Sequence, residues 1–252
     1  MNNFDKQNEL LILDEASSIY TREIAGDIIS SCSELLENDL PQNIKERIAK
    51  IDADCCRLIR NRFIISKLLR FRIAGETTRC CSFTEVYENC YSAAKAICLQ
   101  HGISFRYSDF QIPCKLSSSA EECALLLLLP VTLALEDEAN TSIRIITSKK
   151  KDMLCIEFTF SHKLPDIGAL SDECDSPDHT NGLFFELPMF SHTLRESLKR
   201  LGGELEVSEN TLTLNIPVAE KTTDINSPSE VYIDNRFSLP YIMLSHIIKR
   251  EI

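Results

Sequence analysis

The chain has no surplus of positive charge. Its 252 residues include 27 lysines and arginines against 38 aspartates and glutamates, which gives a formal net charge of -11 and a pI near 5.0. Nucleic-acid binding requires a surface on which Lys and Arg outnumber the acids, because the phosphate backbone must be neutralised. We therefore expect no nucleic acid as the main partner.

The cysteine patterns of metal sites and disulfide frameworks are also missing. The eleven cysteines are an odd number, contain no C-x-x-C motif, and include the adjacent pairs Cys55-Cys56 and Cys80-Cys81. Residues 1–5 lack the basic and apolar character of a secretory signal. The sequence therefore predicts a cytoplasmic protein in a reducing compartment, whose cysteines serve as small apolar residues.

No apolar run is long enough to cross a membrane. The longest, residues 123–135, contains Pro130 and Thr132 and is shorter than the about 20 residues that a spanning helix needs. A Gly-x-Ser-x-Gly nucleophile motif is absent as well. His162, His179 and His192 lie near several aspartates, but their irregular spacing in a loop-like region favours a solvated surface over a metal site. We expect no metal and no membrane contact.

Two long amphipathic segments at the N-terminus dominate the pattern that is present. Residues 12–38 and 43–75 carry apolar side chains at helical spacing and are joined by the short connection 39–42. Two helices alone offer too little partner surface to bury both stripes, so we expect two copies to form an antiparallel four-helix bundle. The stripes comprise Ile12, Ala16, Tyr20, Ile24, Ile28, Cys32 and Leu35 in the first segment, and Ile44, Ile48, Ile51, Cys55, Leu58, Ile65 and Leu69 in the second.

The rest of the chain predicts a second domain of mixed structure. Helical spacing and alternating apolar residues follow one another in an order that favours an α/β sandwich, with helices on one face of a mixed sheet. The expected helices are 83–101, 123–138 and 184–201, and the expected strands are 103–107, 111–116, 142–148, 153–161, 204–207 and 211–216. The predicted divisions are a hairpin at 1–76, the sandwich at 80–218 and a C-terminal extension at 219–252.

Short motifs add a resemblance to a known family. Residues 25–31 read Ala-Gly-Asp-Ile-Ile-Ser-Ser, and residues 69–75 read Leu-Arg-Phe-Arg-Ile-Ala-Gly. Together with the order of elements, they resemble the cytoplasmic core of sensor histidine kinases. They resemble more closely the ChpT-type histidine phosphotransferases, in which a dimeric helical hairpin precedes a degenerate ATPase-like α/β sandwich. The resemblance covers residues 20–217 and implies a response-regulator receiver domain or a hybrid histidine kinase as partner.

The chain departs from this family at its chemistry. The resemblance places the phosphoaccepting histidine on Gly26, and no histidine precedes His101. Glycine has no nucleophile with which to accept a phosphoryl group. Residues 130–135 lack the asparagine that holds Mg²⁺ in the kinases, and the glycine motifs expected near residues 160–162 and 182–184 are missing. We therefore expect neither ATP binding nor any other cofactor, and no kinase activity.

Three hypotheses remain open at this point. The first is a homodimeric, ChpT-like phosphorelay protein that docks receiver domains without carrying phosphate, and acts as an adaptor or competitor. The second is an active phosphotransferase that uses another histidine, His101 being the nearest in sequence. The third is a structural dimeric interaction module unrelated to signalling. The docking surface of the first hypothesis comprises Arg22, Glu23, Gly26, Asp27, Arg57 and Arg60.

Overall fold

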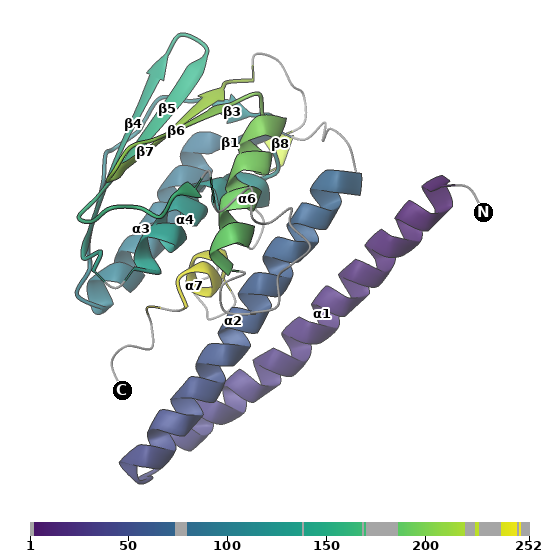
Figure 1. The fold of residues 1–252 in the computed structure, drawn as a ribbon, viewed down its shortest axis with the longest axis vertical. Coiled ribbons are helices and arrows are strands. Elements are labelled where there is room, and N and C mark those ends of the chain that lie inside the picture. Colours follow the sequence, from purple (N-terminus) through teal and green to yellow (C-terminus); the bar gives the residue numbers. More distant parts are fainter. Residues whose placement is uncertain are drawn as a thin grey trace. The chain divides into compact units, whose positions relative to one another are not determined.

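The computed structural model describes residues 3–73, 80–137, 139–167, 169, 186–219, 225–226, 238–245 and 247 (Figure 1). These residues divide into two compact units. One holds the two N-terminal helices together with Ser245 and Ile247, and the other runs from the first strand to Leu244. Each unit is described by itself below.

The helical unit is a hairpin of two antiparallel helices, as the sequence predicts. Helix α1 spans Asn3–Leu36 and helix α2 spans Gln42–Ile73. The first helix therefore begins well before Ile12, and its end is capped by Asn38, whose side-chain amide donates to Glu34 O at 2.9 Å. Pro41 precedes α2, and its carbonyl accepts from Ile44 N at 2.9 Å. Gly75, the expected end of the second helix, lies outside the described residues.

The second unit is built on a five-stranded sheet with the order β2-β4-β5-β7-β6. Strand β2 runs parallel to β4 and all other neighbours are antiparallel, so the sheet is mixed, as predicted. The strands are β2 (Ser104–Tyr107), β4 (Ser142–Lys150), β5 (Met153–Phe160), β6 (Glu204–Val207) and β7 (Thr211–Pro217).

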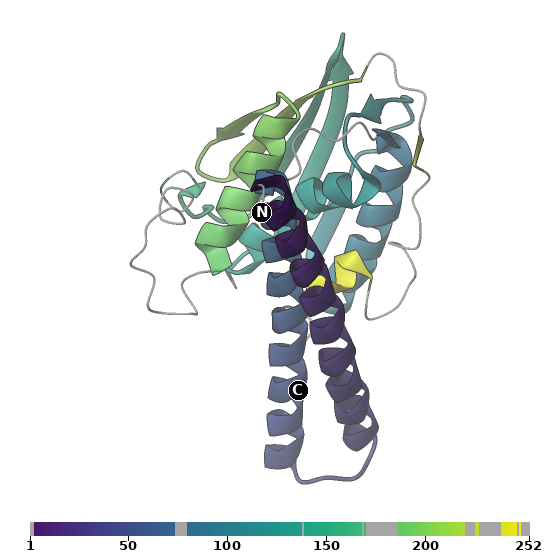
Figure 2. The same ribbon diagram turned by 90° about the vertical axis from the view of Figure 1, so that its right-hand side faces the viewer.

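Three helices cover one face of this sheet (Figures 1 and 2). They are α3 (Phe83–Gln100), α4 (Ala120–Leu135) and α6 (Glu186–Arg200). Strand residues that face the helices are buried, among them Ile145, Ile156 and Leu214. Helix α4 is apolar on all sides and begins with a capping box, in which Ser119 Oγ accepts from Glu122 N at 3.2 Å. The core therefore lies between the sheet and the helices.

Several boundaries differ from the sequence-based prediction. Residues 80–82, for which the sequence predicts no strand, form strand β1 (Cys80–Ser82), which pairs with β3 (Lys115–Leu116) and with β8 (Ile225–Asn226). The strand expected at 111–116 is reduced to β3, and the helix expected at 123–138 is α4. A three-residue strand held by two distant segments has little signal of its own, because its stability comes from non-local pairing.

The C-terminal extension returns to the α/β unit. Helix α7 (Leu239–Met243) packs against α3 and α4, and the buried Thr132 hydroxyl lies 3.4 Å from Met243 O. Leu239, Ile242 and Met243 are buried there. Among the described helices, none combines the length and the apolar character needed to cross a bilayer.

Candidate functional site

The two helices of the hairpin contact each other along a regular line of residues. A helix turns by about 100° per residue, so the residues before and after each contact residue lie on opposite flanks of that helix. Because α1 and α2 are antiparallel, the residues that come just before a contact residue lie on the same face of the hairpin in both helices. The residues that come just after a contact residue lie on the opposite face. Buried residues on this line are Asp14, Ala25, Ile29 and Cys32 in α1, and Ile48, Ile59 and Ser66 in α2.

The preceding residues form an exposed apolar surface, here called the apolar face. Ile24 precedes Ala25, Ile28 precedes Ile29, and Leu58 precedes Ile59. Members are exposed by between 38% at Ile28 and 66% at Leu13. The apolar face comprises Leu13, Tyr20, Ile24, Ile28 and Leu35 of α1, and Ile44, Ile51, Leu58 and Ile65 of α2. The apolar stripes that the sequence predicts are therefore divided between two environments. Cys32 and Ile48 are buried within the hairpin, whereas most other residues of the two stripes are exposed.

A polar network crosses the contact line near the start of α1. Asp14 is 6% exposed, and its Oδ1 lies 2.5 Å from Nη2 of Arg62. The same Nη2 donates to Asp14 O at 2.7 Å, and Ser66 Oγ donates to Asp14 Oδ2 at 2.6 Å. Any sliding of one helix along the other would leave a buried polar atom unpaired, so the network favours a single register. Sequence reasoning missed it, although Asp14 falls at helical spacing from Ala25 and Ile29.

The six residues of the expected docking surface do not share one accessible face. Arg22, Glu23 and Asp27 are exposed on α1. Gly26 is buried and follows Ala25, which places it on the flank opposite the apolar face. On α2, Arg57 is partly exposed, with Nη1 3.8 Å from Asp54 Oδ1, whereas Arg60 is fully buried. Gly26 and Arg60 are therefore not available for direct contact with a partner in this structure.

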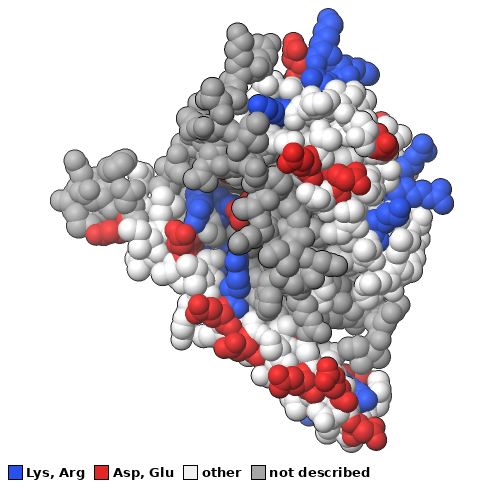
Figure 3. Space-filling model, turned by 180° about the vertical axis from the view of Figure 1, so that it is seen from behind, with Lys and Arg blue, Asp and Glu red and all other residues white. Residues whose placement is uncertain are grey.

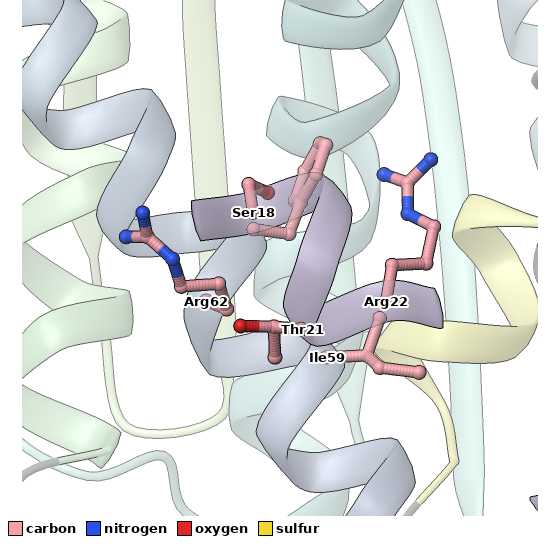
Figure 4. Close-up of a pocket in the computed structure, with 6 residues that line it drawn as sticks. Ser18, Thr21, Arg22, Ile59 and Arg62 are labelled. Carbon is pink, nitrogen blue, oxygen red and sulfur yellow. The ribbon is translucent and has the colours of Figure 1, made fainter. Parts of the chain in front are cut away.

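A shallow hollow between the helices lies beside Arg22 and has no room for a water-sized molecule. Figure 4 shows that the guanidinium groups of Arg22 and Arg62 point to opposite sides of α1, so they do not converge on a common ligand. The Thr21 hydroxyl in its wall donates to Ser17 O at 2.8 Å. The remaining lining residues are Ser18, Ile59 and Phe63. We read the hollow as a packing gap and not as an anion site.

Charge is distributed unevenly along the hairpin. On the face drawn in Figure 3, acidic side chains crowd the end that carries the loop, and basic side chains gather halfway along. Exposed carboxylates near the loop include Glu34, Glu37, Asp39 and Glu46. A partner that docks on this unit would therefore meet acidic and basic areas in succession.

The histidines of the second unit do not build a site among the described residues. His101 is the C-cap of α3, and its Nδ1 is buried. His162 is exposed and His192 is buried on α6, while His179 lies outside the described residues. No group of three or more His, Cys, Asp or Glu side chains in the described part of the chain is arranged to hold a metal ion.

Comparison with known proteins shows which known fold this chain shares. No protein-family model matches the sequence, and no curated protein matches it. Full-length ShkA, whose crystal structure contains AMPPNP, aligns with a TM-score of 0.54 and 11% identity, over 84% of this chain and 46% of that chain. The fold is that of a histidine kinase core. The two N-terminal helices and the mixed sheet with its helices thus match the architecture that the sequence predicts.

Other solved histidine kinases align as well. AdeS of Acinetobacter baumannii aligns with a TM-score of 0.47 and 10% identity, over 79% of this chain and 98% of that chain. The blue-light activated histidine kinase of Erythrobacter litoralis aligns with a TM-score of 0.41 and 16% identity, over 78% and 94%. This chain spans just under half of the length of full-length ShkA.

Proposed function

We propose that this chain is a dimeric, ChpT-like phosphorelay protein of a two-component system that docks receiver domains but does not carry phosphate. It would act as an adaptor, or as a competitor of an active phosphotransferase or hybrid kinase. The observation that carries the proposal is the combination of a histidine kinase core fold with Gly26 at the position that the sequence resemblance gives to the phosphoaccepting histidine.

The apolar face supports the dimeric part of the proposal. Its α2 members, Ile44, Ile51, Leu58 and Ile65, are seven residues apart, which is the repeat by which helices pack into bundles. Each of the nine side chains is exposed by more than a third in the single chain. Burial of a half-exposed apolar side chain of this size contributes on the order of 1 kcal/mol. A second copy of the hairpin would cover this face and complete a four-helix bundle.

The position of Gly26 keeps docking and dimerisation on separate faces. Gly26 follows the contact residue Ala25, whereas Ile24 of the apolar face precedes it. Exposed Arg22, Glu23 and Asp27 surround Gly26 and provide charges of both signs for a receiver domain. Arg57 on α2 is a secondary member of the proposed docking surface, because it is only partly exposed. Arg60 is not included because it is buried.

The experiment uses the purified chain and the receiver domains encoded in the same genome. Each receiver is phosphorylated with radiolabelled acetyl phosphate and mixed with the chain, and both label transfer and complex formation are measured. We expect a complex with at least one receiver and no label on the chain. Label on the wild-type chain would refute the loss of transfer, and loss of that label in His101→Ala would identify the second hypothesis.

The double charge reversal Arg22→Glu with Asp27→Lys serves as the surface test. Both side chains are exposed, so the fold should not change, while receiver binding should fall by at least about tenfold. Glu34→Lys, which lies further along α1 on the exposed surface, is the matched control. Equal binding by both variants would place the receiver on another surface of the chain, whereas no complex with any receiver would favour the third hypothesis, a dimeric module unrelated to signalling.

A further inference from the structure

The two edges of the five-stranded sheet differ in accessibility. At one edge, the side chains of β2 pack on α3: Phe105 is 1% exposed, and the Tyr107 ring packs edge-on against Tyr87 while its hydroxyl donates to Glu88 Oε1 at 3.0 Å. At the other edge, β6 pairs with β7 alone among the described strands, and Val207 is 45% exposed. Val207 at the β6 edge is therefore far more accessible than Phe105 at the β2 edge.

The pairing of β6 with β7 shows which main-chain groups face outward. Ser208 N donates to Thr211 O at 2.9 Å, so these two residues form a hydrogen-bonded pair at the turn. Bonded and non-bonded pairs alternate in an antiparallel ladder. The next pair, Val207 with Leu212, is therefore non-bonded, as is Leu205 with Leu214 two residues further. The N–H and C=O groups of Leu205 and Val207 point away from β7, towards the open edge.

The two faces of the β6 edge carry different side chains. Leu205 and Val207 lie opposite the buried Leu214 and Leu212, which places them on the face covered by helices. Glu204 and Glu206 lie on the outer face and are exposed. Edges that are protected against pairing commonly carry proline, a bulge or an inward-pointing charge. This edge has apolar residues at both inward positions, and its charges are confined to the outer face.

We propose that the β6 edge accepts an extended segment of a partner protein by strand addition, and that this segment alternates apolar residues with Lys or Arg. Main-chain hydrogen bonds to Leu205 and Val207 supply affinity, and the alternation supplies specificity. Apolar side chains of the segment cover Val207, while its cations lie beside Glu204 and Glu206. A second copy of β6 fits less well, because antiparallel pairing would set these carboxylates opposite their own copies.

The test uses the full chain and a short labelled peptide in which valine alternates with lysine, followed by fluorescence anisotropy. We expect saturable binding that is roughly tenfold weaker for the same peptide with glutamate in place of lysine, because two attractive cross-strand pairs become repulsive. Val207→Pro removes the outward N–H and leaves the bonds of Glu206 and Ser208 to β7 in place, so it should abolish binding. Val207→Ala, which keeps the N–H, should retain most of it.

A charge-swap variant keeps the proposal testable if the proline variant fails to fold. The double variant Glu204→Lys with Glu206→Lys changes no main-chain group and should reverse the preference, so that the glutamate peptide binds more tightly. Equal binding by Val207→Pro and Val207→Ala would overturn the proposal. So would an unchanged peptide preference in the charge swap, or an apparent loss of binding that tracks self-association of the chain through β6.

Discussion

At the scale of single residues, the Asp14 carboxylate holds the hairpin together at one end. It accepts from Arg62 and from Ser66, both on α2. Removing it in Asp14→Ala leaves a largely buried guanidinium without its anion and a buried hydroxyl without its acceptor. We expect the free energy of unfolding, measured by urea denaturation, to fall by about 3 kcal/mol.

The neighbouring residue provides the control for this prediction. Glu15 lies 3.5 Å from Arg70, but their side chains are 62% and 44% exposed. An exposed pair of this kind contributes between about 0 and 1 kcal/mol. Glu15→Ala should therefore change the free energy of unfolding by less than about 1 kcal/mol. Similar losses in the two variants would mean that the Asp14 network does not contribute beyond surface electrostatics.

Gly26 is the residue at which the proposed loss of phosphoryl transfer can be tested directly. Gly26→His places an imidazole on the flank of α1 beside exposed Arg22 and Asp27. If the register given by the sequence resemblance is correct, the variant should gain acid-labile label from a phosphorylated receiver, because an imidazole nitrogen supplies the missing nucleophile.

Gly26→Gln is the matched control, because glutamine has similar bulk without a nucleophilic nitrogen. Circular dichroism of both variants should first establish that the helices persist, since Gly26 is buried in the wild-type chain. Label on the histidine variant alone supports the register. A folded Gly26→His that binds receivers without label would place the ancestral site elsewhere on α1.

At the scale of elements, the sequence predicts the hairpin well and its internal packing poorly. Apolar periodicity shows that both helices have an apolar stripe, but it does not decide which of the consecutive residues Ile24 and Ala25 faces α2. Only the structure shows that Ala25, the smaller residue, faces α2 and that Ile24 is left exposed. The small side chain of Ala25 lets the helices approach closely at this point, and the larger Ile24 lies on the flank.

The short elements of the α/β unit were harder to predict for a different reason. Strand β1 forms from Cys80 to Ser82, where neither composition nor alternation distinguishes strand from linker. Its partners β3 and β8 are far away in the sequence. By contrast, β4 and β5 alternate clearly and are joined by the two-residue turn Lys151-Asp152, so their pairing could be predicted.

The apolar face gives the first prediction at this scale. Leu58 is 53% exposed, so Leu58→Glu should leave the folded hairpin intact in the monomer while placing a charge in the centre of the proposed bundle. We expect a dimer in the wild type and a folded monomer in the variant, measured by analytical ultracentrifugation and circular dichroism. Ile59→Glu is the control, because Ile59 is 4% exposed and its substitution should unfold the hairpin. A wild-type monomer would remove the basis for the bundle.

Buried thiols of the α/β unit give a prediction for alkaline pH. Burial raises the pKa of the Cys114 thiol to about 11 and that of the Cys98 thiol to about 12. Between the unfolded and the folded pKa, the folded state keeps a proton that the unfolded state has lost. The stability contributed by these thiols is therefore fully present below about pH 8.5 and is lost as pH rises towards the folded values.

We expect the free energy of unfolding to fall between about pH 8.5 and 11, measured by urea denaturation under reducing conditions. Cys98→Ala and Cys114→Ala should each make this slope shallower, even though the loss of packing lowers their stability at neutral pH. A slope that is unchanged in both variants would show that other groups, such as buried tyrosines, dominate the alkaline transition.

At the scale of the whole molecule, the proposed function requires a kinase-like fold without the chemistry that this fold usually serves. Residues 130–135 of α4, where the resemblance places the Mg²⁺-holding asparagine, include Thr132, Leu133 and Leu135, each exposed by 1% or less. The Thr132 hydroxyl donates a hydrogen bond to Leu128 O at 3.0 Å. The side chains of this stretch of α4 are thus buried in the core, and the Thr132 hydroxyl is already hydrogen-bonded within the helix.

The last prediction concerns nucleotide. A ligand that binds the folded state stabilises it by RT ln(1 + [L]/Kd), or about 2.7 kcal/mol at a hundredfold excess over Kd. Because the one polar side chain at 130–135, Thr132, is buried and donates to Leu128 O, millimolar Mg-ATP should leave the melting temperature of this chain unchanged. A nucleotide-binding histidine kinase measured in parallel shows that the assay detects binding. A rise of several degrees in this chain would mean that its α/β unit holds phosphate through groups other than those of α4, and the adaptor role would then have to give way to a catalytic one.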